Sequence, residues 1–86
     1  MPEICRFYGI IIRMYFNDHN PPHFHAEYQG EQAEYSIKTL EVLAGSVPDR
    51  ANALILEWAS LYRHELLLNW EKAQIPSEID KIEPLR

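Results

Sequence analysis

In HFHAEYQGEQAEYSIK, residues 23–38, apolar and polar side chains alternate along both halves of the segment. Side chains point to opposite faces of a β-strand in turn, so this pattern predicts two strands that each have one apolar face. The apolar positions are Phe24, Ala26, Tyr28, Ala33, Tyr35 and Ile37. The polar positions are His23, His25, Glu27, Gln32, Glu34, Ser36 and Lys38. We therefore expect a β-hairpin that buries the first set and leaves the second accessible.

The turn of this hairpin sets which side chains lie opposite each other. If residues 29–30 form a two-residue loop, His25 lies opposite Glu34, whereas a loop at residues 30–31 places Glu27 there. Both registers keep the apolar positions on one side of the hairpin. Like charges directly opposite each other destabilise a sheet, so we favour the first register.

The sequence before the hairpin predicts more of the same sheet. Residues 4–38 are rich in Ile, Tyr and Phe and are interrupted by turn-forming residues, which is typical of short antiparallel strands. One alternating apolar set consists of Ile10, Ile12, Met14 and Phe16. This strand should end near Phe16, because the following NDHNPP, residues 17–22, contains two prolines that lack N–H donors. A further short strand is expected at residues 40–43.

The second half of the chain predicts one long helix over residues 46–75. Ser46-Val47-Pro48-Asp49 fits an N-cap pattern with a proline in the first turn. Apolar side chains then recur every three or four residues, at Leu54, Ile55, Trp58, Leu61, Tyr62, Leu66, Trp70 and Ala73. A straight helix of this length would measure about 40 Å, so a bend or a break within it is an alternative.

These elements define the expected fold class. It is α+β, with a small antiparallel β-sheet packed against one long C-terminal α-helix, in a single domain that spans residues 1–86. Residues 76–86 are expected to form an extended tail over the core, because prolines bracket this weakly patterned segment.

Composition and charge limit the classes of function. The chain has 86 residues, a net charge of −5 and one cysteine. A domain this small hides only about two-thirds of its surface, so contact with a second copy or another protein would stabilise it. The negative charge provides no overall attraction for nucleic acid. With a lone Cys5, no signal-peptide pattern and no long apolar run, we expect a cytoplasmic protein that has no membrane segment.

The segment around residues 19–27 carries the candidate chemistry. His23, His25 and Glu27 share one strand face in the predicted hairpin, and His19 precedes them in the proline-containing loop. Neutral imidazoles and a carboxylate suit Zn²⁺ or a similar divalent ion. One hypothesis is therefore a divalent-metal site with the ligands His19, His23, His25 and Glu27.

A second hypothesis uses the same face for acid–base catalysis. Imidazoles titrate near neutral pH, so His23 and His25 could act as acid and base in phosphodiester cleavage. Arg13 or Lys38, from neighbouring strands, would hold the phosphate. The simpler interpretation is that these residues are ordinary polar side chains on the solvated face of an antiparallel sheet.

Several stretches resemble a known family. RFYGIIIRMYFNDHNPPHFHAEY (residues 6–28), SIKTLEVLAGSVPDRA (36–51) and LEWASLYRHELLLNWE (56–71) closely resemble the bacterial domain-of-unknown-function family numbered 4160, and the likeness extends to KIEPL at residues 81–85. The resemblance implies a toxin–antitoxin style pair, because such genes often neighbour a gene of the domain-of-unknown-function family numbered 2442. It implies no established role for any residue.

The leading functional expectation is a protein-binding component of such a two-gene pair, with the neighbouring gene's small protein as its partner and a homo-oligomer as a further option. Contacts through the sheet edge or through helix aromatics such as Trp58, Tyr62 and Trp70 would mediate binding. The alternatives are a small ribonuclease-like hydrolase or a divalent-metal-binding protein that uses the His19–His25 segment. Nucleic acid is a partner only for the hydrolase, and whether the protein is an enzyme is left open.

Overall fold

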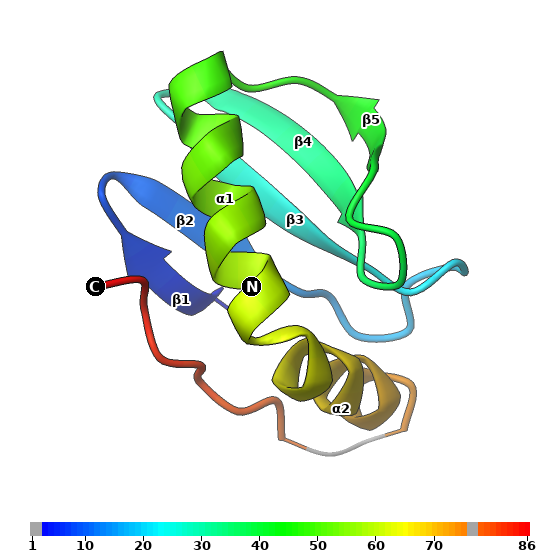
Figure 1. Ribbon diagram of the computed structural model, residues 1–86. Helices are drawn as coiled ribbons and strands as arrows, with labels where there is room; N and C mark the ends of the chain where they lie inside the picture. Colours follow the sequence, from blue (N-terminus) through cyan, green and yellow to red (C-terminus); the bar gives the residue numbers. More distant parts are fainter. Residues whose placement is uncertain (1–2, 76–77) are drawn as a thin grey trace.

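The computed structural model describes residues 3–75 and 78–86, which form one five-stranded sheet and two helices (Figure 1). The elements are β1 (Glu3–Phe7), β2 (Ile10–Arg13), β3 (His23–Tyr28), β4 (Glu31–Ser36), β5 (Val42–Gly45), α1 (Asp49–Leu61) and α2 (Arg63–Ala73). Each strand pairs antiparallel with the next one along the chain, in the order β1-β2-β3-β4-β5. The predicted α+β class and antiparallel sheet are therefore confirmed.

The β3–β4 hairpin has the register that we favoured. His25 lies opposite Glu34, and Tyr28 lies opposite Glu31. The two turn residues, Gln29 and Gly30, both have positive φ angles, of 50° and 84°. Such turns twist in the same sense as the strands that they join.

The strands before the loop are shorter than expected. The strand predicted to reach Phe16 ends at Arg13. Met14 is still fully buried, but Phe16 is 48% exposed. The backbone N–H of Asn17 donates to the carbonyl of Ala73 at the end of α2, so the chain has left the sheet by this point. The further strand expected at residues 40–43 is β5, displaced toward the C-terminus.

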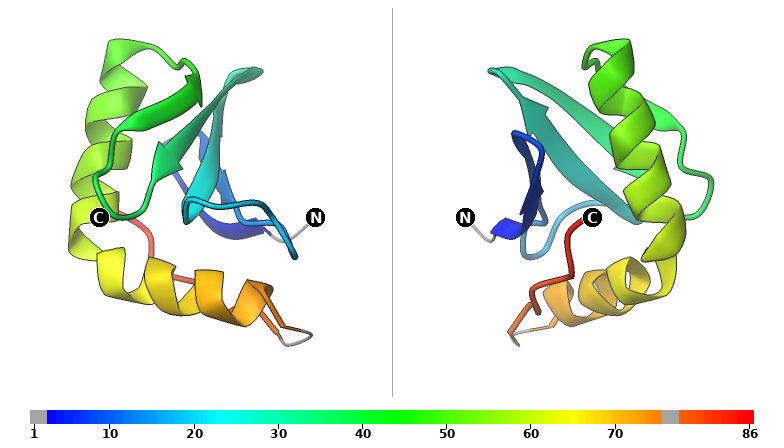
Figure 2. Two further views of the ribbon diagram at one scale, coloured as in Figure 1. Left: turned by 90° about the vertical axis from the view of Figure 1, so that its right-hand side faces the viewer. Right: turned by 60° about the vertical axis from the view of Figure 1, so that its left-hand side comes forward.

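The prediction of one long helix over residues 46–75 was wrong. The helix breaks at Tyr62 (φ −116°, ψ 24°). The longest dimension of the molecule is 34 Å, so a straight helix of about 40 Å would extend beyond the sheet. Instead, α1 crosses one face of the sheet and α2 turns away to run along its end (Figure 2). The apolar faces of both helices thereby pack against the same small sheet.

The first helix also begins later than predicted. It starts at Asp49, after Pro48, and no side chain caps it. Ser46 lies three residues before the first helical residue, and its backbone N–H donates to the carbonyl of Gln32, which extends the pairing between β5 and β4. Tertiary hydrogen bonding thus overrides the local capping pattern.

The core lies between α1 and the sheet. Trp58 is fully buried, with ring centroids 5.4 Å from Phe7 and 5.9 Å from Phe24. Trp70 of α2 is also buried, and Tyr62 is half-buried. The two tryptophans therefore cannot provide the exposed aromatic contacts that we expected for a protein partner.

The C-terminal segment, residues 78–86, has no regular secondary structure and passes from α2 to the outer edge of β1 (Figure 1). The backbone N–H of Ile82 donates to the carbonyl of Ile4, and Trp58 Nε1 donates to the carbonyl of Glu83. Residues 76–77 of the predicted tail lie outside the described residues. Neither described helix combines the length and hydrophobicity needed to span a bilayer.

Candidate metal centre

His23 is the first residue of β3 and its side chain is only 1% exposed. By strand alternation it lies on the face opposite Phe24, the face that we expected to be accessible. The indole of Trp70 covers it, with ring centroids 5.2 Å apart, and the ring of His19 from the preceding loop lies 5.1 Å away. The loop and α2 thus enclose this end of the polar face, and the expectation of an open surface is wrong for His23.

The two ring nitrogens of His23 have different surroundings. Nδ1 lies 2.8 Å from the carbonyl oxygen of Pro21. Because a carbonyl only accepts hydrogen bonds, this contact assigns a hydrogen to Nδ1. In the neutral ring, Nε2 then carries a lone pair, and this buried atom has no hydrogen-bond partner. A metal-ligating histidine commonly shows this arrangement, in which one nitrogen donates to a carbonyl and the other is free to bind the ion.

Asp18 connects three histidines. Its Oδ2 lies 3.0 Å from Nε2 of His23 and 3.1 Å from Nε2 of His25. Its Oδ1 accepts the backbone N–H of His19 and lies 3.0 Å from Nδ1 of that residue. Burial raises the pKa of Asp18, but the hydrogen bonds from His25 and His19 and the nearby imidazole charges outweigh this effect. The net result is a pKa below the usual value, so the group is a carboxylate at neutral pH.

Two overlapping sets of donor atoms surround His23. Asp18, His23 and His25 form one set, and His19, His23 and Glu34 form the other, with all donor atoms of a set within 4.8 Å of one another. Glu34 comes from β4, and its Oε1 lies 3.6 Å from Nε2 of His23. The exposure of the side chains rises from 1% at His23 to 75% at His19. The cluster therefore has a buried centre and a solvent-facing side.

The predicted metal ligands are only partly brought together. His19, His23 and His25 lie in the cluster, but Glu27 does not belong to either donor set. Its carboxylate instead pairs with Arg13, at 2.7 Å. Arg13 lies opposite His25 in the sheet, so it draws Glu27 away from the imidazoles. The carboxylates of the two donor sets are instead those of Asp18 and Glu34.

Sequence reasoning did not identify Asp18 and Glu34 as candidate ligands. The sequence nevertheless placed both residues near the predicted histidines. Asp18 immediately precedes His19, and Glu34 lies opposite His25 in the register that we favoured. The sequence did not show that the carboxylate of Asp18 contacts two imidazoles of β3 in the folded chain.

The residues proposed for acid–base catalysis have a less suitable arrangement. Nε2 of both His23 and His25 points to the same carboxylate oxygen, and His23 is closed off from solvent. Arg13 is engaged by Glu27. Lys38 is exposed in the turn after β4 and forms no ion pair in the described part of the chain. The geometry thus favours ion binding over proton transfer by two free imidazoles.

The fold and the cluster define a small α+β protein with a meander sheet and a half-enclosed His–Asp–Glu centre. A family model described as "Domain of unknown function (DUF4160)" matches residues 9–71, and the chain belongs to this family. All five residues of the cluster lie within the matched range. No curated protein and no solved structure matches the chain.

Proposed function

We propose that the protein binds a divalent transition-metal ion through Asp18, His23 and His25, with His19 and Glu34 available on the solvent-facing side. The observation that carries this proposal is the buried Nε2 of His23, which has no hydrogen-bond partner although Asp18 Oδ2 lies 3.0 Å away. A buried polar atom without a partner is costly. A cation between the lone pair of Nε2 and the carboxylate would satisfy both groups.

A proton on Nε2 is the alternative way to balance the carboxylate. That arrangement would give a charged hydrogen bond, but the two atoms lack hydrogen-bond geometry in spite of their short separation. The short contact is better explained if Nε2 of His23 and Oδ2 of Asp18 are two ligand atoms that face the same ion position.

The distances between the donor atoms also suit an ion. Zn²⁺ binds nitrogen and oxygen at about 2.0–2.2 Å, so neighbouring ligand atoms in a tetrahedron lie about 3.3 Å apart. Asp18 Oδ2 lies 3.0 and 3.1 Å from the two Nε2 atoms, and Glu34 Oε1 lies 3.6 Å from the nearer one. Two or three imidazoles with carboxylates favour Zn²⁺ and related transition metals over Mg²⁺ and Ca²⁺, which prefer oxygen ligands.

The two other functional hypotheses stay predictions. A metal-dependent hydrolase would use the same cluster, and the exposure of His19 would give substrate access to its outer side. A role as a protein-binding component does not depend on the ion, and its surface has to lie elsewhere than on the buried Trp58 and Trp70.

The proposal is tested by measuring Zn²⁺ affinity and stoichiometry with a competing chromophoric chelator, on protein without an affinity tag. We expect one ion per chain. Asp18→Asn and His25→Gln should each weaken binding by at least about tenfold, because each removes a direct ligand. Neither residue is fully buried, so both variants should fold, which circular dichroism checks.

Two matched variants serve as controls. His64→Gln removes the exposed histidine of α2, and Glu27→Gln removes the carboxylate that pairs with Arg13. Both should retain the affinity of the unmodified protein. The absence of stoichiometric Zn²⁺, Ni²⁺ or Cu²⁺ binding would refute the proposal, as would an equal loss in the His64 and His25 variants.

A further inference from the structure

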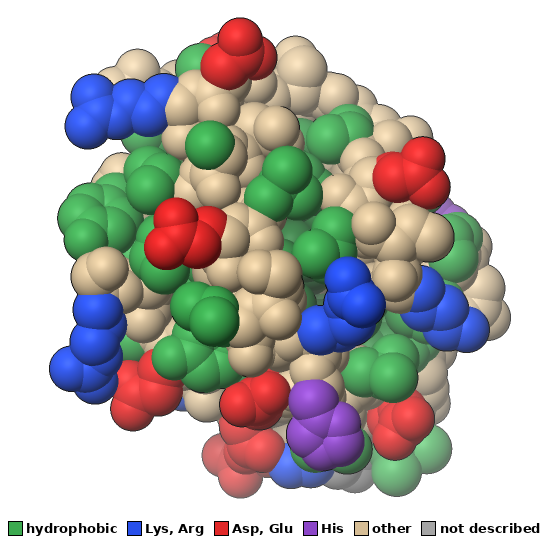
Figure 3. Space-filling view, viewed as in Figure 1, with side chains coloured by type: hydrophobic (Ala, Val, Ile, Leu, Met, Phe, Trp, Pro, Cys, Tyr) green, Lys and Arg blue, Asp and Glu red, His purple; other side chains and the backbone are tan. Residues whose placement is uncertain are grey.

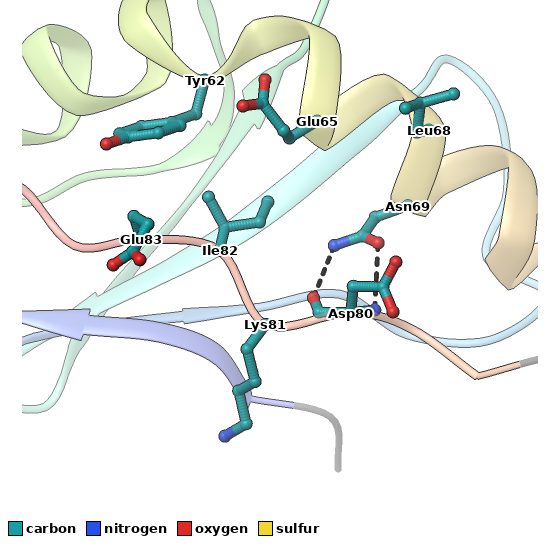
Figure 4. Close-up of a pocket in the computed structure, with 8 residues that line it drawn as sticks. All are labelled: Tyr62, Glu65, Leu68, Asn69, Asp80, Lys81, Ile82 and Glu83. Atoms are coloured by element: carbon teal, nitrogen blue, oxygen red, sulfur yellow. Dashed lines mark hydrogen bonds between the residues drawn. The ribbon is translucent and has the colours of Figure 1, made fainter.

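A second concave feature lies between α2 and the C-terminal segment, and it shares no residue with the histidine cluster. It is a groove of about 230 Å³, bordered by Tyr62, Glu65, Leu68, Asp80, Ile82 and Glu83 (Figure 4). Pockets for drug-sized ligands usually enclose roughly 300–1,000 Å³. This groove is therefore of a size for one or two side chains rather than for a larger cofactor.

The floor of the groove is apolar. Ile82 points up toward α2 beneath Tyr62, and Leu68 continues the apolar surface with a side chain that is 44% exposed (Figure 4). Asn69 could have provided polar groups, but its side-chain amide donates to the carbonyl of Asp80 and accepts the backbone N–H of the same residue. The floor thus offers an aromatic ring and aliphatic surface.

The rim of the groove is negatively charged. Glu65 forms no ion pair in the described part of the chain. The ion pair between Glu83 and Arg86 is long, at 3.9 Å, and both side chains are mostly exposed. Such an exposed contact contributes little. Lys81 points away from α2 in Figure 4, and Lys72 pairs with Asp80. Acidic side chains also gather at this lower end of the molecule in Figure 3. Two carboxylates therefore flank Tyr62 without a strong cation partner.

We propose that this groove is a docking site for a partner protein, which inserts an arginine or lysine side chain of an amphipathic basic segment against Tyr62 and between Glu65 and Glu83. Charge complementarity identifies this occupant. A long basic side chain places its aliphatic stem on Leu68 and Ile82 and its cationic head on the ring face and the carboxylates. Aromatic and arginine anchors of this kind commonly dominate the binding energy of protein interfaces.

This inference goes beyond metal binding and is independent of it. The test uses the whole protein and a ten-residue probe peptide with leucine and arginine in helical spacing. A second peptide, with glutamine in place of arginine, is the neutral control. Binding is followed by amide chemical shifts in nuclear magnetic resonance spectra. We expect saturable binding of the arginine peptide alone, with the largest shifts at Glu65, Leu68 and Ile82.

A double variant measures how much the two carboxylates contribute to peptide affinity. Glu65→Gln with Glu83→Gln should weaken binding of the arginine peptide about fivefold, which is the effect of losing two exposed charge contacts. Glu31→Gln with Glu41→Gln changes the net charge equally, at exposed sites on the sheet side, and should leave the affinity unchanged within about twofold.

Three results would overturn the proposal. One is the absence of saturable binding by the arginine peptide. Another is an equal loss of affinity in the two double variants, which would indicate general charge attraction. The third is a concentration-dependent dimer in sedimentation experiments whose contact shields the amides of Glu65 and Leu68, which would show that a second copy of the chain occupies the groove.

Discussion

The indole of Trp70 packs against the imidazole of His23, with ring centroids 5.2 Å apart and planes inclined at 49°. This contact joins α2 to the start of β3, and it places a natural fluorophore beside the proposed ion. Trp58, the other tryptophan, lies in the core between α1 and the opposite face of the sheet.

We therefore expect Cu²⁺ or Ni²⁺ to quench the emission of Trp70 when it binds, because both ions quench fluorophores at short range. Fluorescence titration measures the effect. In a Trp70→Phe variant, the remaining emission of Trp58 should change much less on addition of the same ion. Quenching of equal size in both proteins would contradict the placement of the ion beside His23.

The second prediction concerns two glycines with similar backbone angles. Gly45 has φ +73°, and a Cβ there would lie 2.2 Å from the carbonyl oxygen of Gln32. Gly30 has φ +84°, but a Cβ there would meet nothing within 4 Å. Gly30→Ala should lower the free energy of unfolding by about 1–2 kcal/mol, the cost of a left-handed alanine.

Gly45→Ala should carry this cost and, because of the clash with β4, a further loss of about 1–3 kcal/mol. Urea denaturation of the two variants measures the difference. Equal stabilities would mean that β5 can move away from β4 without a penalty.

The third prediction concerns Cys5, which is buried at the edge of the core. Burial raises the pKa of its thiol from 9.0 to about 11. Between these values the unfolded chain loses the proton while the folded chain keeps it. The free energy of unfolding should therefore fall as the pH rises from about 9 to 11, by up to about 1.4 kcal/mol per pH unit.

Cys5→Ala removes this contribution. The pH dependence of unfolding in the variant should be shallower over the same range, while the part due to Tyr35, whose pKa burial also raises, remains in both proteins. Thermal or urea unfolding at a series of pH values provides the comparison. Identical slopes would show that the thiol ionises as easily in the folded state as in the unfolded chain.

The β3–β4 hairpin shows where reasoning from the sequence succeeds. Alternation between the faces of a strand depends only on neighbouring residues, and like-charge repulsion between Glu27 and Glu34 correctly favoured the observed register. The membership of the chain in its family likewise follows from short stretches of sequence, and the family-model match confirms it.

The helices show where this reasoning fails. Apolar spacing is continuous from residue 54 to 73, so nothing local marks Tyr62 as the point where the helix breaks. The break shows only in the tertiary structure, where α1 crosses one face of the sheet and α2 runs along its end (Figure 2). Ser46 is likewise not the cap, because its N–H extends the pairing with β4 and the helix starts only at Asp49.

The candidate site combines both cases. The residues between His19 and His25 mark the place and the chemistry, because imidazoles in that loop and strand are visible in the sequence alone. Which carboxylates lie beside them depends on how the chain folds. Glu27 pairs with Arg13 across the sheet, whereas Asp18 contacts His23, and Trp70 covers the His23 ring. Strand alternation is a property of adjacent residues, but ligand choice is a matter of distances between segments that meet only after the chain has folded.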